Sequence, residues 1–273
     1  MIGIGKNLFK ANVKAGAAAP AYDADALAYF TANTAITSEA DKNAINSFYL
    51  GLKSDGIYTK IKAMYLPIWG SAAACKWNLV NPVDTNAAYR LTFSTGWTFS
   101  SSGATPNGTS AYADTFLKPS TSLVSNSNHL CVYARTNQVS NAVPIGSYGD
   151  SSTINQLNIS TGTGYYYYSG GLSTELYSAL ADSKGFFVGT TRANNDRKTF
   201  RNNTQQASLT TSVFTAYSTL NIYIGARNFI GTPSNYTTQQ LSFSSIGDGL
   251  TDAEENNFYN KVQTLMTYFG INV

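Results

Sequence analysis

The sequence is poor in charge, cysteine and histidine, and it contains no long apolar run. Charged side chains make up 12% of the 273 residues, against roughly 25% in an ordinary soluble domain. No stretch approaches the ~18 consecutive apolar residues that are needed to span a bilayer, since the apolar segment Ala63 to Trp69 is short and contains Pro67. We therefore expect no membrane partner.

Cysteine and histidine are too few and too scattered for a familiar metal or catalytic site. Cys75, Cys131 and the only histidine, His129, match no zinc-ligand spacing. No G-x-S-x-G motif precedes a helix, so we interpret His129 as a satisfied or half-exposed strand residue rather than a base. Lysines interrupt the place where a signal peptide needs an apolar stretch, and we expect no secretion signal and buried, reduced cysteines.

Acids at the spacing of a glycosidase are also missing. Sandwich-fold glycosidases place two carboxylates on either side of the sugar bond, often two or four residues apart on one strand. The five acids between Arg90 and Ser245 show no such spacing: Asp114, Asp150, Glu175, Asp182 and Asp196. The segments GIGKN and SIGDGLTDAE lack the remainder of a phosphate loop and of an EF-hand. We predict a protein that is not an enzyme and has no metal and no cofactor.

Aromatic and small polar residues make up for the missing charge. The chain contains 19 Tyr, 14 Phe and 22 Gly, which is typical of β-rich proteins with many turns. From residue 57 onward, short strand-like runs alternate with clusters of Gly, Asn, Ser and Pro. One run, near Leu220 to Gly225, has Ile222 and Ile224 on one side and Tyr223 on the other. The pattern predicts a sandwich or a barrel over residues 57–248.

Helical patterns precede and follow this region. Within residues 23–56 we expect two helices, the second with Ser38 as N-cap and Asp55-Gly56 at its end. Within residues 249–273, Thr251 and Glu254 form a capping box before an apolar stripe, and Gly270 supplies the stop. We expect these helices to pack beside the sandwich.

The first 22 residues carry the entire net charge of +3, because the other 15 basic and 15 acidic side chains cancel. A segment so poor in apolar anchors buries too little surface to fold alone, so we expect a flexible basic arm. It could instead dock on an acidic protein surface or contact phosphate, although the charge is too local to predict a specific nucleic-acid partner. The candidate attachment residues are Lys6, Leu8, Phe9, Lys10 and Lys14.

A run of four tyrosines, GYYYYSGG, alternates between two faces of a strand. One pair packs in the core. The pair Tyr165 and Tyr167 is a candidate for stacking on a sugar ring, although packing against neighbouring strands is the favoured interpretation of such pairs.

Three long segments resemble virion structural or tail-fibre-like proteins of bacteriophages: YDADALAYFTANTAITSEADKNAIN with LKSDGIYTKIKAMYLPIWG, KWNLVNPVDTNAAYRLTFSTGWTFSSSGATPNGTSAYADTFLKPS, and SFSSIGDGLTDAEENNFYNKVQTLMTYFG. Within that family, NGTSAYADT resembles a turn and strand of a laminin-G-like or concanavalin A-like jelly roll. The resemblance implies a mainly β jelly-roll sandwich with flanking helices. It also implies a ligand-binding rim at which Tyr112 and Asp114 share one face.

The resemblance favours a noncatalytic virion protein that decorates a capsid or tail and contacts other virion proteins or a host-surface glycan. It implies a homo-oligomer that assembles in the host cytoplasm and resides in the virion. The alternative is a carbohydrate-binding module or a degraded glycosidase of the concanavalin A-like class. The missing export signal favours the virion protein.

Overall fold

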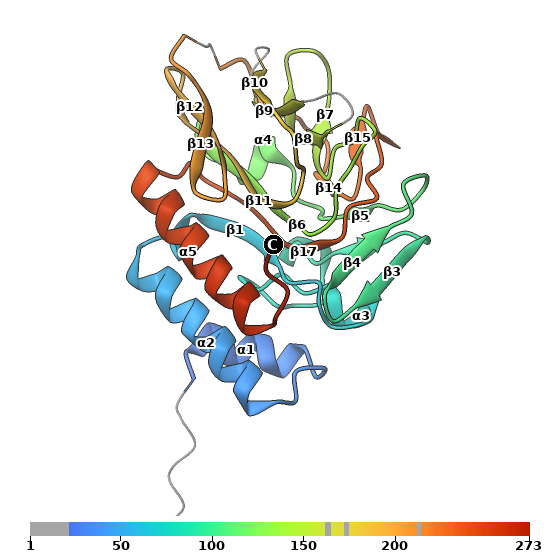
Figure 1. Ribbon diagram of the computed structural model, residues 1–273, viewed down its shortest axis with the longest axis vertical. Helices are drawn as coiled ribbons and strands as arrows, with labels where there is room; N and C mark the ends of the chain where they lie inside the picture. The colour runs from blue at the N-terminus through green and yellow to red at the C-terminus, as the bar shows by residue number, and fades with distance from the viewer. Residues whose placement is uncertain (1–21, 162–164, 172–174, 212–213) are drawn as a thin grey trace, which may run out of the picture.

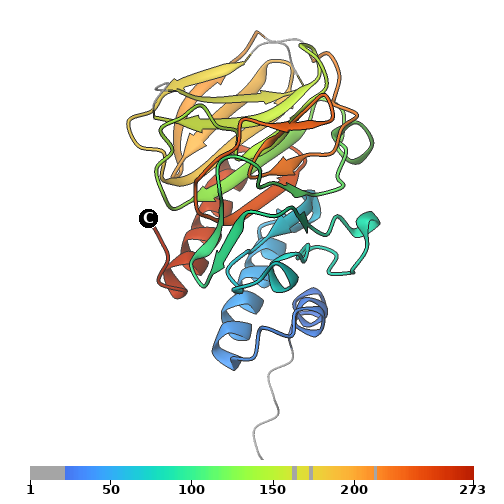
Figure 2. The ribbon, with the colours of Figure 1, turned by 90° about the vertical axis from the view of Figure 1, so that its right-hand side faces the viewer.

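The computed structural model describes residues 22–161, 165–171, 175–211 and 214–273. They form three layers, a group of helices and two β-sheets, which we call sheet A and sheet B (Figures 1 and 2). The expectation of a mainly β protein with helices at both ends is confirmed. The predicted arm lies outside the described residues, apart from Tyr22. None of the helices within these ranges has the length and apolar character that crossing a membrane requires.

The helical layer combines segments from both ends of the chain. Helix α2 (Glu39–Ser54) begins at Ser38, whose side chain accepts a hydrogen bond from the backbone N–H of Asp41. Helix α5 (Asp252–Tyr268) begins at the predicted capping box of Thr251 and Glu254. The two helices pack side by side, and α1 (Ala24–Ala32) packs against α2 (Figure 1). The N-terminal and C-terminal helical segments therefore form one layer.

Sheet A lies under these helices. In the described residues it has eight strands, in the order β13-β12-β11-β6-β17-β4-β3, with β1 paired to β17. The strands are β1 (Ile61–Tyr65), β3 (Trp97–Ser100), β4 (Gly103–Pro106), β6 (Asn128–Ala134), β11 (Gly185–Ala193), β12 (Asp196–Arg201), β13 (Thr204–Leu209) and β17 (Leu241–Gly247).

Sheet B lies on the far side of sheet A. In the described residues it has nine strands, in the order β10-β9-β8-β7-β14-β5-β2, with β15 paired to β7 and to β16. The strands are β2 (Thr92–Phe93), β5 (Ala113–Asp114), β7 (Ile145–Tyr148), β8 (Ile154–Ser160), β9 (Tyr165–Gly170), β10 (Leu176–Ala179), β14 (Tyr223–Ile224), β15 (Arg227–Phe229) and β16 (Thr232–Ser234). Short helical turns complete the chain: η1 (Tyr58–Lys60), α3 (Ala72–Cys75), η2 (Asn86–Ala88) and α4 (Pro119–Ser122).

Sheet A separates two apolar cores. On β6, Leu130 and Val132 pack between the sheets, whereas Cys131 and Tyr133 face the helices. Every residue of β6 is buried because both faces of the strand are covered. Cys75 and Cys131 are free and buried, as expected.

The predicted strand near Leu220 to Gly225 is wrong over most of its length, since only Tyr223–Ile224 forms β14. The backbone N–H of Ile222 donates to the carbonyl of Leu117, and Gly225 has a φ of 86° that turns the chain. Most of this segment is therefore loop, and the chain turns at Gly225. Local alternation in the sequence does not show either feature.

Candidate functional site

The two outer faces of the sandwich differ in their cover. Helices α2 and α5 lie on the outer face of sheet A, whereas β7, β8 and β15 of sheet B lie at the opposite end of the molecule (Figures 1 and 2). Side chains of sheet B that point away from the core are therefore not covered by these helices.

Strand register shows which of these side chains lie on the outer face of sheet B. Tyr223 on β14 is opposite Asp114 on β5 and Gly146 on β7, whereas the neighbouring Ile224 and Ala113 belong to the core between the sheets. Because directly paired residues share a face, Tyr223 and Asp114 lie on the outer face. The ring of Tyr112 stacks on that of Tyr223, with centroids 4.6 Å apart and an interplanar angle of 27°.

Asp114 holds the backbone beneath this tyrosine pair. Its Oδ1 accepts a hydrogen bond from the backbone N–H of Phe116 at 2.7 Å, and its Oδ2 accepts one from Nδ2 of Asn221 at 3.0 Å. Burial raises the pKa of Asp114, against the lowering effect of those two bonds. Both carboxylate oxygens are thus engaged in local structure.

A second aromatic group surrounds a guanidinium. The ring centroids of Tyr148 and Phe229 are 4.9 Å apart, and the guanidinium of Arg227 lies 5.0 Å from the first ring and 4.7 Å from the second. Arg227 also donates to Oδ1 of Asn235 at 2.9 Å and to Oε1 of Gln156 at 3.4 Å. The planar cation of Arg227 and the amide groups of Asn235 and Gln156 thus lie beside the rings of Tyr148 and Phe229.

The two groups are neighbours. Tyr148 is two residues beyond Gly146 on β7, and Gly146 is opposite Tyr223. Diagonal neighbours of this kind lie about 7–8 Å apart on one face of a sheet. We call the five residues Tyr112, Tyr148, Tyr223, Arg227 and Phe229 the aromatic face.

The predicted residues Tyr165 and Tyr167 lie on β9 of sheet B. Tyr167 pairs with Asn158 and Tyr177, whereas the adjacent Tyr168 pairs with Leu157 and is fully buried in the core. The side chains of Tyr165 and Tyr167 lie outside the described part of the structure, as do the arm residues Lys6, Leu8, Phe9, Lys10 and Lys14.

Of the five residues of the aromatic face, Tyr112 was named as a candidate from the sequence and the other four were not. Tyr148, Arg227 and Phe229 come together only because β15 pairs in parallel with β7, with Phe229 opposite Tyr148. The one signal in the sequence was Tyr223, which alternation placed on the other face of its strand from Ile222 and Ile224. A parallel pairing between distant segments leaves no local pattern.

The histidine site is a polar junction with no access for a substrate. Nδ1 of His129 lies 2.7 Å from the carbonyl oxygen of Asp248, so Nδ1 carries the proton and Nε2 accepts from the hydroxyl of Ser245 at 2.9 Å. His129 and Ser245 resemble a base and nucleophile, yet both are fully buried. Burial lowers the pKa of His129 to about 4, against the raising effect of Asp248.

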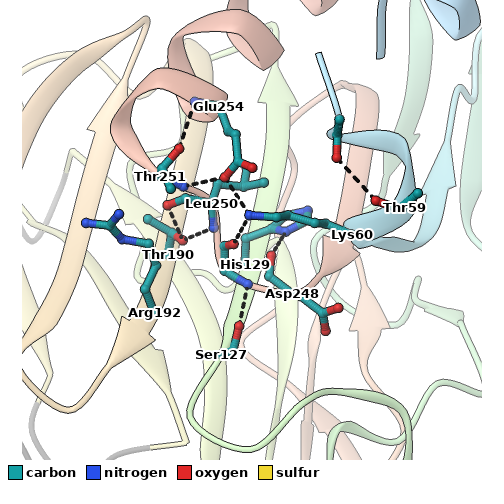
Figure 3. Close-up of polar contacts among 12 residues, drawn as sticks. Thr59, Lys60, Ser127, His129, Thr190, Arg192, Asp248, Leu250, Thr251 and Glu254 are labelled. Carbon is teal, nitrogen blue, oxygen red and sulfur yellow. Dashed lines mark hydrogen bonds and ion pairs between the residues drawn. The ribbon is translucent and has the colours of Figure 1, made fainter. Parts of the chain in front are cut away.

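Figure 3 shows how this junction joins α5 to the sandwich. Nζ of Lys60 lies 2.6 Å from Oε2 of Glu254 and 3.3 Å from the carbonyl oxygen of Gly249. The same carboxylate oxygen accepts the backbone N–H of Thr251 at 2.8 Å. These bonds tie the first turn of α5 to the start of β1, so we assign the cluster a structural role. Within the described ranges, no group of three or more His, Cys, Asp or Glu side chains could hold a metal ion.

Comparison with known proteins identifies a fold rather than a family. No protein-family model matches the chain, and no curated protein sequence matches it. A sialidase of Trypanosoma rangeli, solved with a difluoro-KDN compound, superposes with a TM-score of 0.53 at 10% identity, over 80% of this chain and 39% of the sialidase. The chain therefore spans about two fifths of that enzyme's length.

Two smaller carbohydrate-binding structures superpose less well. The CBM40 module of a Ruminococcus gnavus sialidase, bound to α2,3-sialyllactose, gives a TM-score of 0.40 at 16% identity over 48% of this chain and 80% of the module. Domain 4 of an arabinanase from Geobacillus stearothermophilus, bound to arabinotriose, gives 0.45 at 14% identity over 73% of this chain and 98% of that domain. The superposition with the Trypanosoma sialidase therefore shows a distant likeness of fold alone, and the comparisons give no evidence for a bacteriophage family.

Proposed function

We propose that this protein is a noncatalytic glycan-binding module with a concanavalin A-like jelly-roll sandwich, and that the aromatic face of sheet B holds the sugar. The observation that carries the proposal is the pairing of two aromatic groups with a guanidinium and two amides on a sheet face that the long helices leave uncovered.

The chemistry of these side chains suits a sugar. A pyranose ring presents one face of C–H groups and a rim of hydroxyls, and tyrosine and phenylalanine offer a flat apolar surface that stacks on such C–H groups. Arg227 and Asn235 offer polar groups beside that surface, which would fix the orientation of the hydroxyls. Phe229 is 37% exposed, so its ring is accessible to a ligand.

Absence of catalysis is part of the proposal. Both oxygens of Asp114 are committed to Phe116 and Asn221, and a glycosidase needs one free carboxyl as acid and a second as base or nucleophile. Substitution of Asp114 would therefore weaken folding rather than turnover.

A bacteriophage virion protein remains the second candidate, and it rests on the sequence resemblance alone. In that role the same face would contact a host-surface glycan while the helical layer contacts other virion proteins in a homo-oligomeric assembly. Mass analysis of purified phage particles tests this role independently of sugar binding.

The sugar-binding proposal is tested with an immobilised glycan panel, followed by calorimetry on any glycan retained. We expect Tyr223→Ala and Phe229→Ala each to weaken binding about tenfold, equivalent to about 1.4 kcal/mol, because each removes a stacking surface. Tyr268→Ala is the matched control, since Tyr268 is an exposed aromatic residue on the helical layer.

Binding that survives both face substitutions, or that is lost equally in the Tyr268 control, would overturn the assignment of the face. Failure of the wild-type protein to retain any glycan would overturn the function itself.

A further inference from the structure

The helical layer carries an apolar groove. A cavity of about 390 Å³ lies between α2 and α5, lined by Ala44, Phe48, Leu265 and Tyr268 among others. Lys261 also lines this cavity, and its Nζ forms a salt bridge with Oδ2 of Asp55 at 3.4 Å. The lining is largely carbon, which favours an apolar side chain as occupant.

A second cavity lies next to the first and has a different chemistry. It measures about 350 Å³ and is lined by Asp41, Trp69 and Phe269, with the two rings edge to face at 5.8 Å. The hydroxyl of Tyr268 donates to Oδ1 of Asp41 at 2.9 Å and connects the two cavities. An acid beside aromatic walls favours a cation such as a lysine ammonium. We call the two cavities together the helix groove.

Among the described residues, no lysine or arginine forms an ion pair with Asp41. Its neighbour Glu39 pairs with Lys42 at 2.7 Å, and Asp55 pairs with Lys261. Asp41 accepts only the hydroxyl of Tyr268 through its side chain. The second cavity therefore contains an acid whose charge is not balanced by a described cation.

The charges of the chain's segments are complementary. Residues 22–56 contain five acids and two lysines, and α5 contains three acids and one lysine. Residues 1–21 contain three lysines, four positions apart, and no acid. Large apolar side chains accompany these lysines, as in Leu8-Phe9-Lys10 and Val13-Lys14. An apolar anchor next to a lysine is the combination that the helix groove accommodates.

The described chain begins beside the groove. The hydroxyl of Tyr22 donates to Oε2 of Glu39 at 2.5 Å, and its ring packs on Phe30 at 5.2 Å. Glu39 is two residues before Asp41 on α2. The thirteen residue-to-residue steps from Phe9 to Tyr22 can span up to about 43 Å, whereas the 16-residue α2 is only about 24 Å long. The N-terminal segment can therefore reach every part of the groove.

We propose that residues 1–21 dock into the helix groove of their own chain, with Phe9 or Leu8 in the apolar cavity and a lysine beside Asp41. Attachment through Tyr22 gives this segment an effective concentration in the millimolar range, which favours its own groove over that of another copy. The contact covers the apolar lining and balances the charge of Asp41, and it does not depend on sugar binding.

Hydrogen exchange on the full chain tests the proposal. We expect the amides of residues 5–15 to exchange at least tenfold slower than in a free peptide of that sequence, because docking protects them. The double variant Leu8→Ser/Phe9→Ser should exchange about tenfold faster than wild type over those residues. Asn12→Ser is the matched control, and it should leave the rate unchanged.

A groove variant provides an independent check. Ser47 is an exposed residue that lines the apolar cavity, so Ser47→Trp should fill the space and accelerate exchange of residues 5–15 as strongly as the double variant. Asp41→Lys should do the same, and Lys6→Glu/Lys10→Glu/Lys14→Glu added to it should restore protection.

Two results would overturn the proposal. One is exchange of residues 5–15 at the free-peptide rate in the wild-type chain. The other is protection that appears only when the protein concentration is raised from about 1 to about 100 µM, since an intramolecular contact is independent of concentration and such a result would assign the groove to a second copy.

Discussion

The two outer faces of the sandwich differ in burial. Sheet A presents Cys131, Tyr133 and Phe243 to the helices, and these side chains are fully buried in an apolar core. Sheet B presents tyrosines, a phenylalanine and an arginine that stay partly exposed. Both faces are rich in aromatic residues, so composition alone does not separate a core from an exposed surface. What separates them is whether another layer covers the face.

The difference extends to polar groups. The covered side contains a histidine with both ring nitrogens engaged and a buried glutamate, Glu255, whose two carboxylate oxygens have no hydrogen-bond partner among the described residues. On the uncovered side, Asp114 and Arg227 form hydrogen bonds while remaining partly exposed. Changes on the covered side should therefore alter stability and its pH dependence, and changes on the uncovered side should alter binding.

The largest expected effect is that of a charge placed under α5. Leu265 is 2% exposed within the apolar core beneath the helices. Leu265→Asp should lower the free energy of unfolding by about 5 kcal/mol, because it removes a buried apolar side chain and adds an unpaired charge. Urea denaturation measures this.

The control for that change is the adjacent Thr264→Asp, on the exposed side of the helix, which should cost less than about 1 kcal/mol. Equal losses in the two variants would show that the packing of α5 does not depend on its apolar stripe.

A matched pair of phenylalanines compares the two faces directly. Phe258 of α5 is fully buried against Phe243 of sheet A, whereas Phe229 is 37% exposed on the aromatic face. Phe258→Ala should lower the free energy of unfolding by about 4 kcal/mol and Phe229→Ala by less than about 1 kcal/mol. If thermal and chemical denaturation gave Phe229 the larger loss, that ring would be structural and the comparison would fail.

The third prediction concerns alkaline pH. Burial, with a smaller effect from Asp252, raises the pKa of Glu255 from 4.5 to about 8. The folded state therefore favours the protonated form, and the associated stability is complete below pH 4.5 and is lost as the pH rises toward 8. Glu255→Gln should be more stable than wild type by about 2–3 kcal/mol near pH 8.

That gain should shrink steadily as the pH falls, and denaturation curves between pH 5 and pH 9 would reveal it. A constant difference across the range would mean that Glu255 titrates normally in the folded protein.

The smallest effect is expected at acid pH, from His129. Its pKa is lowered from 6.5 to about 4, so its contribution to stability is complete above pH 6.5 and is lost as the pH falls toward 4. His129→Asn should remove about 1–2 kcal/mol of pH dependence over this window. Because the chain has one histidine, its ring proton resonance is also unambiguous, and a midpoint near 6.5 would contradict the prediction.

Local sequence determined the elements whose signals lie within a few residues. Ser38 and Thr251 cap their helices as predicted because a cap is a contact between residues three apart. His129 was likewise predicted to be a strand residue, and it lies on β6. The shared face of Tyr112 and Asp114, by contrast, was implied by the jelly-roll resemblance.

The tertiary structure alone decided which of these faces became a core and which a surface. Helices α2 and α5 are about 200 residues apart in the sequence and cover the same sheet, and Tyr148 meets Phe229 through a parallel pairing of distant strands. A hydrophobic or aromatic pattern indicates that a face of a strand is apolar. It does not indicate whether another segment of the chain covers that face, or which segment does. Long-range packing determines which segment covers a face. Because the free energy of that packing depends on all segments together, a short window of sequence does not reveal it.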